Sequence, residues 1–215
     1  MLEEANAARL RTLDLGALDR QRALLENRSY LSRQWLRVLP TQKQHQLADP
    51  EVTEALRSRL LLPSQLLEGA CHACGSFPTL GHEDVCRGAD RRWISRYNQV
   101  NRAFIKALSS RPDLEVQGEP HPDPRARAEP RPDFSCLLRT SRYYYDIQIV
   151  AVNKDSAREG AFETLAEAAA EKKRKYRHLG ASFFLLIFSS GGLIEKETAK
   201  TYKGLQKQLG PIASS

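Results

Sequence analysis

Apolar and polar residues are arranged along this chain in a way that predicts a helical first part. Leucine, arginine, glutamine and alanine dominate residues 2–37, which predicts helix up to a break at Pro40. Asp49 and Pro50 suit a second helix start, with Asp49 as its cap. Apolar residues at helical spacing continue this second helix up to Pro63.

From residue 91 the pattern predicts helix, three strands, helix, strand and helix. Large apolar residues at i, i+3, i+4 spacing predict the first helix; they are Trp93, Ile94, Tyr97, Val100, Phe104, Ile105 and Leu108. The predicted strands cover 114–117, 133–139, 143–152 and 181–189, and the later helices cover 157–178 and 194–209. The expected fold class is therefore α/β (α+β), with a mixed sheet flanked by helices behind a helical N-terminal segment.

Charge adds an expectation about partners. The chain has 33 basic and 26 acidic residues, a formal net charge of +7 and a pI near 9.4. Such a protein is expected to bind a polyanion, most commonly nucleic acid, with ordinary surface charge as the alternative. Between Arg87 and Arg111, seven arginines and lysines stand against one acid, Asp90.

No segment of the sequence reaches the ~18 consecutive apolar residues of a membrane span. The longest apolar run, at 183–188, has the length of a strand, and the first ten residues lack the apolar core of a signal peptide. We therefore expect an intracellular protein with no membrane partner. Cysteines in that setting are better read as metal ligands or buried thiols than as disulfides.

Three of the four cysteines fall in a short segment with metal-ligand spacing. The pattern C-x2-C-x7-H-x3-C is formed by Cys71, Cys74, His82 and Cys86. Four protein ligands around Zn²⁺ leave no open position, so the expected zinc is structural. The alternative is a set of unconnected buried cysteines; His72 is a competing imidazole disfavoured by its place between two cysteines. Cys136 is expected to be a core thiol.

Two aspartates on neighbouring predicted strands form a candidate catalytic site. Asp133 opens one strand and Asp146 lies on the next, so in a hairpin their side chains can converge and bind Mg²⁺. Such an ion can polarise a phosphodiester and activate water. Gln148 points to the same face as Asp146, and Glu119 is a further candidate carboxylate. The alternative is a pair of ordinary strand-end aspartates, although Asp146 interrupts an apolar run and needs a partner or an ion.

Phosphodiester cleavage also needs positive charge near the transition state. The predicted helix after these strands carries Lys172, Lys173 and Lys175. One of these lysines could reach the metal site while the others contact the DNA backbone. A solvated helix face is the alternative interpretation.

In their order along the chain, these motifs resemble the restriction-like endonuclease domain at the C-terminus of certain site-specific non-LTR retrotransposon proteins. In that family a Cys-Cys-His-Cys knuckle precedes a basic-His-Asn motif, a Pro-Asp motif, a second Asp and a helix ending in Lys-Tyr. The corresponding residues after the knuckle are Arg96-Tyr97-Asn98, Glu119-Pro120, Pro132-Asp133, Asp146 and Lys175-Tyr176. The segment Trp35 to Pro63 also looks like the family's link to its knuckle, so the resemblance spans about residues 30–178.

The resemblance implies a PD-(D/E)xK nuclease that cleaves target DNA with Mg²⁺ or Mn²⁺ to prime reverse transcription. It implies that Asp133 and Asp146 hold the metal, and that the catalytic lysine is one of Lys172, Lys173 and Lys175. The implied DNA contacts are Arg92, Arg96, Asn98, Arg102 and Lys173. DNA is the expected partner, with RNA and a reverse transcriptase from the same element as open alternatives, and the expected location is nuclear.

The sequence departs from the family's pattern at three points. Gln148 stands where the superfamily's usual lysine would be, and that lysine is expected on the following helix instead. Tyr97 replaces the histidine of the basic-His-Asn motif. A polymerase aspartate pair is absent, so the chain is expected to be a fragment, a degraded copy or a gene that kept only the nuclease end.

These observations predict a helical N-terminal segment at 1–66, a zinc knuckle at 67–90 and a restriction-like endonuclease domain at 91–215. The expected function is metal-dependent cleavage of DNA, with Gln148 counted beside the catalytic aspartates. A nucleic-acid-binding module without catalysis is the main alternative. A zinc-stabilised interaction protein, with helices 2–37 and 194–209 as partner surfaces, is a third.

Overall fold

The structure is a computed structural model that describes residues 18–36, 46–62, 69–76, 82–86, 88, 90–122, 130–154, 157 and 160–209. The chain divides into two compact units. The first comprises Met1–Asp90, Ala151–Ala161 and Ser190–Leu193, and the second comprises Arg91–Val150, Phe162–Ser189 and Ile194–Ser215. Residues 2–17 and 37 of the helix predicted over 2–37 lie outside the described residues, as do the side chains of Arg92 and Trp93.

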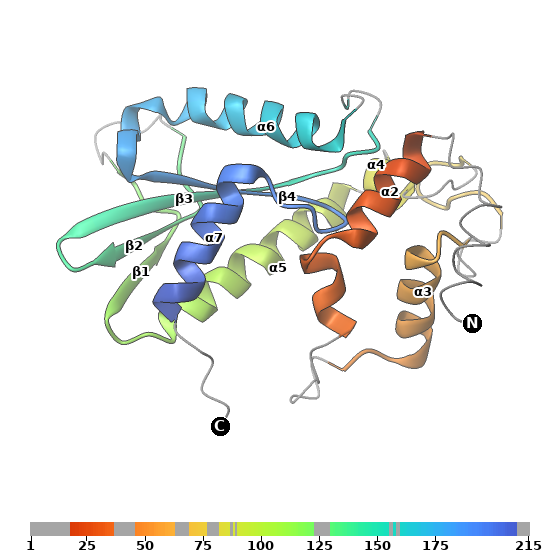
Figure 1. The fold of residues 1–215 in the computed structure, drawn as a ribbon, viewed down its shortest axis with the longest axis horizontal. Helices are drawn as coiled ribbons and strands as arrows, with labels where there is room; N and C mark the ends of the chain where they lie inside the picture. The colour runs from red at the N-terminus through yellow and green to blue at the C-terminus, as the bar shows by residue number, and fades with distance from the viewer. Residues whose placement is uncertain are drawn as a thin grey trace. The chain divides into compact units, whose positions relative to one another are not determined.

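The described helices of the first unit are short (Figure 1): α2 (Leu18–Arg28), the 3-10 helix η1 (Leu31–Leu36), α3 (Asp49–Arg59) and α4 (His82–Val85). Arg59 joins α3 to the α2–η1 segment. Its guanidinium donates to the carbonyls of Ser32 at 2.6 Å and Asn27 at 2.7 Å, and the Asn27 amide donates back to the Arg59 carbonyl at 3.0 Å. None of the residues of α3 is buried, so these polar contacts matter more than apolar packing for holding it.

The predicted cap of α3 is wrong by one residue. Ala48, not Asp49, is the N-cap, and its backbone N–H donates to the Glu51 carboxylate at 2.7 Å. Glu51 is the third helical residue, so its side chain reaches back to the cap and Asp49 becomes the first residue of the helix. The helix also ends at Arg59 rather than at Pro63, because Leu61 has a φ of +54°.

The second unit has the predicted order of elements. Its helices are α5 (Asp90–Ser109), α6 (Ala161–Lys175), the 3-10 helix η3 (Arg177–Ser182) and α7 (Lys196–Leu209). Its strands are β1 (Leu114–Gly118), β2 (Phe134–Leu138), β3 (Ser141–Val150) and β4 (Phe183–Ser189). They form one mixed sheet in the order β1-β2-β3-β4, in which only β3 and β4 are parallel. A mixed α/β fold with a sheet flanked by helices is therefore confirmed.

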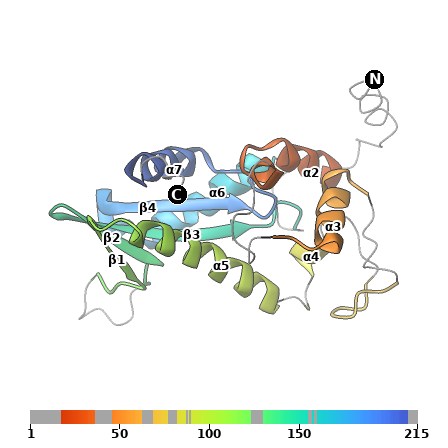
Figure 2. The same cartoon turned by 90° about the horizontal axis from the view of Figure 1, so that it is seen from below.

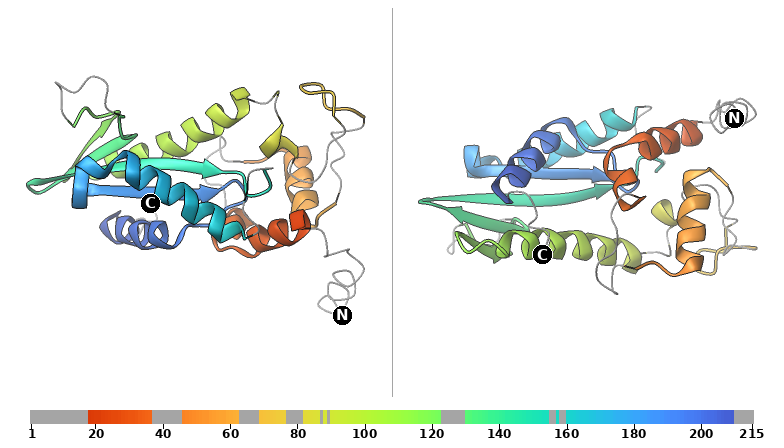
Figure 3. Two further views of the ribbon diagram at one scale, coloured as in Figure 1. Left: turned by 90° about the horizontal axis from the view of Figure 1, so that it is seen from above. Right: turned by 60° about the horizontal axis from the view of Figure 1, so that its bottom comes forward.

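Helices cover both faces of this sheet: α6 lies on one face, and α5 and α7 lie on the other (Figures 2 and 3). The aromatic core is on the α5–α7 face, where Phe134 stacks on Tyr145 with ring centroids 4.8 Å apart. Phe104 of α5 lies 6.2 Å from Phe134 and 6.3 Å from Tyr202 of α7. Ile94 departs from the predicted apolar stripe, because it is 60% exposed in the first turns of α5.

Strand β3 extends past the start of β2, and this offset prepares the candidate active site. Phe134, the first residue of β2, pairs with Tyr145, so the part of β3 from Asp146 to Val150 pairs only with β4. The parallel β3–β4 pair requires a crossover, which α6 provides. The C-terminal end of α6 returns to the Asp146 region of β3, where Lys172 Nζ lies 2.7 Å from Asp146 Oδ2.

Candidate metal centre and candidate active site

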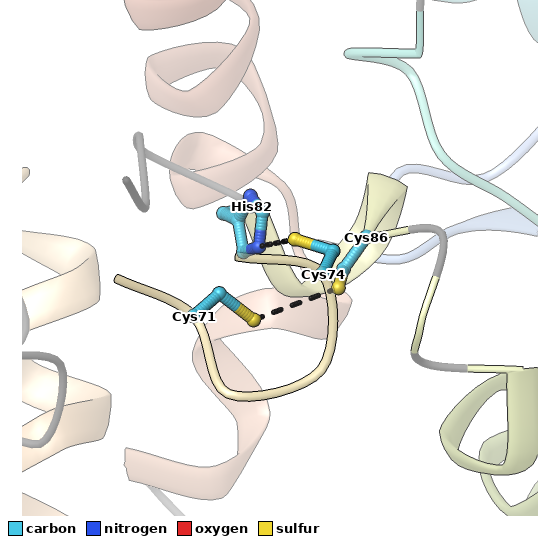
Figure 4. A group of neighbouring side chains, drawn as sticks. All are labelled: Cys71, Cys74, His82 and Cys86. Carbon is cyan, nitrogen blue, oxygen red and sulfur yellow. Dashed lines mark hydrogen bonds between the residues drawn. The ribbon is translucent and has the colours of Figure 1, made fainter. Parts of the chain in front are cut away.

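Cys71, Cys74, His82 and Cys86 come together in the first unit (Figure 4). A tight turn presents the first two thiols: the Gly75 N–H donates to the Cys71 carbonyl at 2.7 Å, and Gly75 has a φ of +74°, which favours glycine. Helix α4 presents His82 and, directly after its last residue, Cys86. The tight turn and the helical turn therefore bring together the four residues of the predicted C-x2-C-x7-H-x3-C pattern.

The distances within this cluster fit a tetrahedral zinc. Cys71 Sγ and Cys86 Sγ are 3.7 Å apart, Cys74 Sγ and His82 Nε2 are 3.4 Å apart, and all four ligand atoms lie within 4.8 Å of one another. A tetrahedron with Zn–S of about 2.3 Å and Zn–N of about 2.0 Å has S–S edges of about 3.8 Å and S–N edges of about 3.5 Å. A disulfide would need sulfurs about 2.05 Å apart. The cluster can therefore hold a metal ion such as zinc, and it leaves out the exposed His72.

Local hydrogen bonds prepare two of the thiols for metal binding. The backbone N–H groups of Ala73 and Ser76 are the largest causes that lower the pKa of Cys71 and Cys74, respectively. Burial raises the pKa of Cys86. Cys136 is unrelated to this cluster: it is buried on β2, burial raises its pKa to about 11, and the prediction of a core thiol is confirmed.

Asp133 lies at the point where β2 begins beside the longer β3. Its backbone N–H donates to the Tyr145 carbonyl at 2.9 Å, which continues the strand pairing by one residue. Its Oδ2 then accepts the Ile147 N–H at 2.5 Å, and its Oδ1 accepts the phenolic O–H of Tyr97 on α5. Both carboxylate oxygens of Asp133 are therefore held by protein donors.

Asp146 is buried on β3, with 2% of its surface exposed, and faces α6. The Tyr176 hydroxyl lies 2.6 Å from Asp146 Oδ1 and 2.8 Å from the Arg131 carbonyl, so its one proton is shared between two acceptors. Lys172 Nζ lies 2.7 Å from Asp146 Oδ2. This distance is that of an ion pair, and Oδ2 accepts no hydrogen bond. Lys172 and Asp146 therefore attract each other through their charges.

The two aspartates belong to one electrostatic cluster. Burial raises the pKa of Asp133, and the negative charge of Asp146 raises it further; donation from Tyr97 and Ile147 and the charge of Lys172 oppose this. Burial also raises the pKa of both Tyr97 and Tyr176, and the bonded aspartates add to the effect. Both phenols therefore remain protonated donors. Two adjacent carboxylates of this kind are suitable ligands for a hard divalent cation.

The structure separates the three candidate lysines. Lys172 reaches the carboxylate cluster, whereas Lys173 pairs with Glu197 at 2.5 Å on an exposed surface. Lys175 is exposed and its ammonium lies 5.2 Å from the centroid of the Tyr176 ring. Of these lysines, Lys172 alone contacts a carboxylate of the cluster.

Gln148 and Glu119 lie near the cluster in different ways. Gln148 follows Asp146 on the same face of β3, and its buried Oε1 has no hydrogen-bond partner among the described residues. Glu119 is exposed; its N–H donates to the Asp133 carbonyl at 2.9 Å, and its charge contributes to the raised pKa of Tyr97.

The candidate DNA contacts on α5 flank Tyr97 along the helix. Arg96 and Asn98 are half-buried, and Arg102 is exposed with its Nε donating to the Asn98 carbonyl at 3.1 Å. The structure places Arg96 and Asn98 next to Tyr97 along α5, and Tyr97 donates to Asp133.

Sequence reasoning missed the two tyrosines as partners of the aspartates. Tyr97 was assigned to the apolar stripe and noted as a replacement of a motif histidine, and Tyr176 was noted only as the end of a motif. A usable signal was present, because a buried tyrosine needs a hydrogen-bond partner. Tyr97 lies on α5 and Tyr176 directly follows α6, close to the two aspartates.

No protein-family model and no curated protein matches this chain. None of the described helices is long and apolar enough to cross a membrane.

Proposed function

We propose that this chain is a metal-dependent DNA endonuclease of the restriction-like, PD-(D/E)xK type. The observation that supports the proposal best is the convergence of Asp133, Asp146 and Lys172. These residues come from the start of β2, the middle of β3 and the last turn of α6, yet they share one electrostatic cluster. A carboxylate pair beside a lysine, at the end of a mixed sheet, is the arrangement that this chemistry needs.

Asp133 and Asp146 would hold Mg²⁺ or Mn²⁺, and the bound ion would polarise the scissile phosphate and acidify a water molecule. Lys172 is paired with Asp146 and only partly exposed, with 22% of its side chain accessible. It can turn from that carboxylate toward a phosphate and stabilise the negative charge that develops there. Gln148, with its free buried acceptor, can orient a water molecule beside Asp146.

Positive charge would attract the DNA. The net charge of +7 favours a polyanion, and Arg96, Asn98 and Arg102 extend along α5 from the Tyr97 position. Lys173 would add a backbone contact from α6. The zinc cluster would stabilise the first unit. An origin in a retrotransposon, a nuclear location and a reverse transcriptase partner belong to the same proposal and rest on the resemblance alone.

Cleavage of supercoiled plasmid with Mg²⁺ or Mn²⁺ tests this proposal. The wild-type chain should nick or linearise the plasmid, while Asp133→Ala and Asp146→Ala should bind DNA without cutting it. Asp113→Ala is the matched control, because Asp113 is exposed and pairs with Arg111 near the start of β1. Equal cleavage by all four proteins would refute the assignment.

A nucleic-acid-binding protein without catalysis is the second candidate, and one observation favours it. Both oxygens of Asp133 and Oδ1 of Asp146 accept protein hydrogen bonds, and Oδ2 of Asp146 lies 2.7 Å from the Lys172 ammonium, so protein groups already offset the buried charges without a metal. Such a binder should show salt-sensitive DNA binding that is indifferent to divalent metal. The nuclease should not cleave plasmid in the absence of the divalent metal.

A further inference from the structure

Tyr97 holds Asp133 from the side opposite to its contact with β3. The phenolic O–H of Tyr97, on α5, donates to Oδ1, and the backbone N–H of Ile147, on β3, donates to Oδ2 at 2.5 Å. Asp133 itself precedes β2. The Asp133 carboxylate therefore connects α5, β3 and the start of β2. Of its two hydrogen bonds, the one from Tyr97 comes from a side chain and the one from Ile147 comes from the backbone.

The orientation of this carboxylate decides whether it can serve as a metal ligand. An aspartate can rotate about its last side-chain bond, but donors on both oxygens oppose that rotation. Each carboxylate oxygen has two lone-pair positions, so one donor per oxygen still leaves a position for a cation. The two hydrogen bonds can therefore fix Asp133 and keep it available.

We propose that Tyr97 is a positioning residue, whose phenolic O–H holds Asp133 in the orientation that receives the divalent metal. The inference rests on the proposed function and assigns a role to a residue that the sequence pattern left in the core. Tyr97 does not act on the substrate. It acts through Asp133, from the helix that also bears Arg96, Asn98 and Arg102.

The electrostatics of the pair agree with this role. Burial and the bond to Asp133 raise the pKa of Tyr97, so its hydroxyl stays neutral and donating at physiological pH. As a donor to Oδ1, Tyr97 can stabilise the negative charge that Asp133 needs to bind a cation. The donor atoms of a histidine lie nearer the backbone than a tyrosine hydroxyl, so a histidine at position 97 would hold its donor farther from Asp133 than Tyr97 does.

Mn²⁺ binding by the zinc-loaded full chain, followed by electron paramagnetic resonance, tests the proposal without requiring cleavage. Zinc loading occupies the thiolate cluster, which Mn²⁺, a hard cation, does not displace. Tyr97→Phe should weaken Mn²⁺ binding by roughly 10–100-fold, the usual effect of losing a partner that orients a ligand. Tyr97→His should weaken it similarly because the imidazole holds its donor farther from Asp133.

Tyr143→Phe is the matched control, since it also removes one phenolic hydroxyl. Tyr143 lies on β3 with its ring edge against Phe184, and it has no bond to the aspartates among the described contacts. Its Mn²⁺ affinity should equal that of the wild type. Circular dichroism should show the same fold and melting behaviour in Tyr97→Phe, and raising Mn²⁺ should restore its cleavage, which damage to the fold would not allow.

The outcomes separate this inference from the proposed function. Unchanged Mn²⁺ affinity in Tyr97→Phe, with plasmid cleavage by the wild type, would overturn the positioning role and leave the nuclease standing. Weakened affinity without cleavage by any protein would support the positioning role and overturn the nuclease. A zinc-loaded wild type that binds no Mn²⁺ would overturn both.

Discussion

Lys172 and Asp146 are paired at 2.7 Å between Nζ and Oδ2, and they join the last turn of α6 to the middle of β3. Tyr176, four residues after Lys172, lies 2.6 Å from the other oxygen of the same carboxylate. The Tyr176 N–H donates to the Lys172 carbonyl at 3.0 Å, so Tyr176, directly after α6, lies one helical turn from Lys172 and on the same face. One cation and one neutral donor thus reach a single buried aspartate. The pairing indicates which lysine serves the candidate active site.

Lys172→Met should therefore slow plasmid cleavage strongly. Loss of a group that stabilises developing negative charge lowers the rate by roughly 10²–10³-fold. DNA binding should change little, because many other basic residues remain. The measurement is the cleavage rate at saturating Mn²⁺, together with the dissociation constant for the uncut plasmid.

Lys173→Met is the control for this experiment. Lys173 is the next residue on the same helix, but its partner is the exposed Glu197 rather than a carboxylate of the site. Lys173→Met should bind plasmid somewhat more weakly, because Lys173 is proposed to contact the DNA backbone, but at saturating plasmid it should cleave at close to the wild-type rate. Equal losses in the two variants would contradict the assignment of Lys172.

Much of the fold could be predicted because it depends on local periodicity. The apolar stripe over 93–108 lies on α5, and the four segments predicted as strands correspond to β1, β2, β3 and β4. The predicted hairpin of the second and third strands is the antiparallel pair β2–β3. The zinc cluster was also predictable, since ligands spaced by a tight turn and by one helical turn have few other ways to meet.

The details of the carboxylate site could not be predicted, because they depend on the rotation of helices about their axes. Adjacent residues of a helix point about 100° apart, so Lys172 and Lys173 face different partners, and nothing in the local sequence fixes which. Tyr97 fits an apolar stripe equally well whether its hydroxyl meets water or a carboxylate. The N-cap of α3 is Ala48 because the Glu51 carboxylate accepts the Ala48 N–H, and the sequence pattern at Asp49 did not reveal this contact.

The zinc prediction is tested by metal content. The wild-type chain should contain one zinc per molecule, and Cys86→Ser should lose it because the buried fourth ligand is removed. Hydrogen exchange should then rise in the described parts of the first unit, while the sheet of the second unit stays protected. Elemental analysis and exchange mass spectrometry measure the two effects.

Cys136→Ala is the matched control, since it removes a buried thiol on β2 that is not part of the cluster. It should keep one zinc and lose a small amount of stability, on the order of 1 kcal/mol, for the smaller side chain in the core. Zinc retained by Cys86→Ser, or lost by Cys136→Ala, would contradict the ligand assignment.

The pH dependence of metal binding follows from Asp133. Burial and the charge of Asp146 raise its pKa above the ordinary 3.8. A metal binds the charged carboxylate, so Mn²⁺ affinity should fall as the pH drops through this raised pKa, at a higher pH than for an ordinary aspartate. The stability of the metal-free chain should change with pH in the opposite direction. The folded state holds the proton of Asp133 more tightly than the unfolded state does. The favourable contribution of Asp133 to folding is therefore present below pH 3.8 and is lost as the pH rises through the raised pKa.

Mn²⁺ titrations from about pH 4 to about pH 7 and thermal melts over the same range measure both effects. Asp133→Asn should remove the pH-dependent step in affinity and bind Mn²⁺ weakly throughout. If the Mn²⁺ affinity of the wild type does not fall between about pH 7 and about pH 4, the Asp133 carboxylate titrates in the ordinary range, which would contradict the prediction.

Salt dependence tests the role of α5 in DNA binding. Arg102 is exposed on α5, along the helix from Tyr97, whereas Arg139 is exposed in the β2–β3 turn. If Arg102 contacts a phosphate, Arg102→Gln should weaken binding uniformly across sequences and reduce the slope of log affinity against log salt by about 1. Arg139→Gln, which removes the same charge elsewhere, should leave that slope nearly unchanged. Equal changes in the two variants would show that net charge, rather than a defined face of α5, governs binding, and would favour ordinary surface charge over a specific interface on that helix.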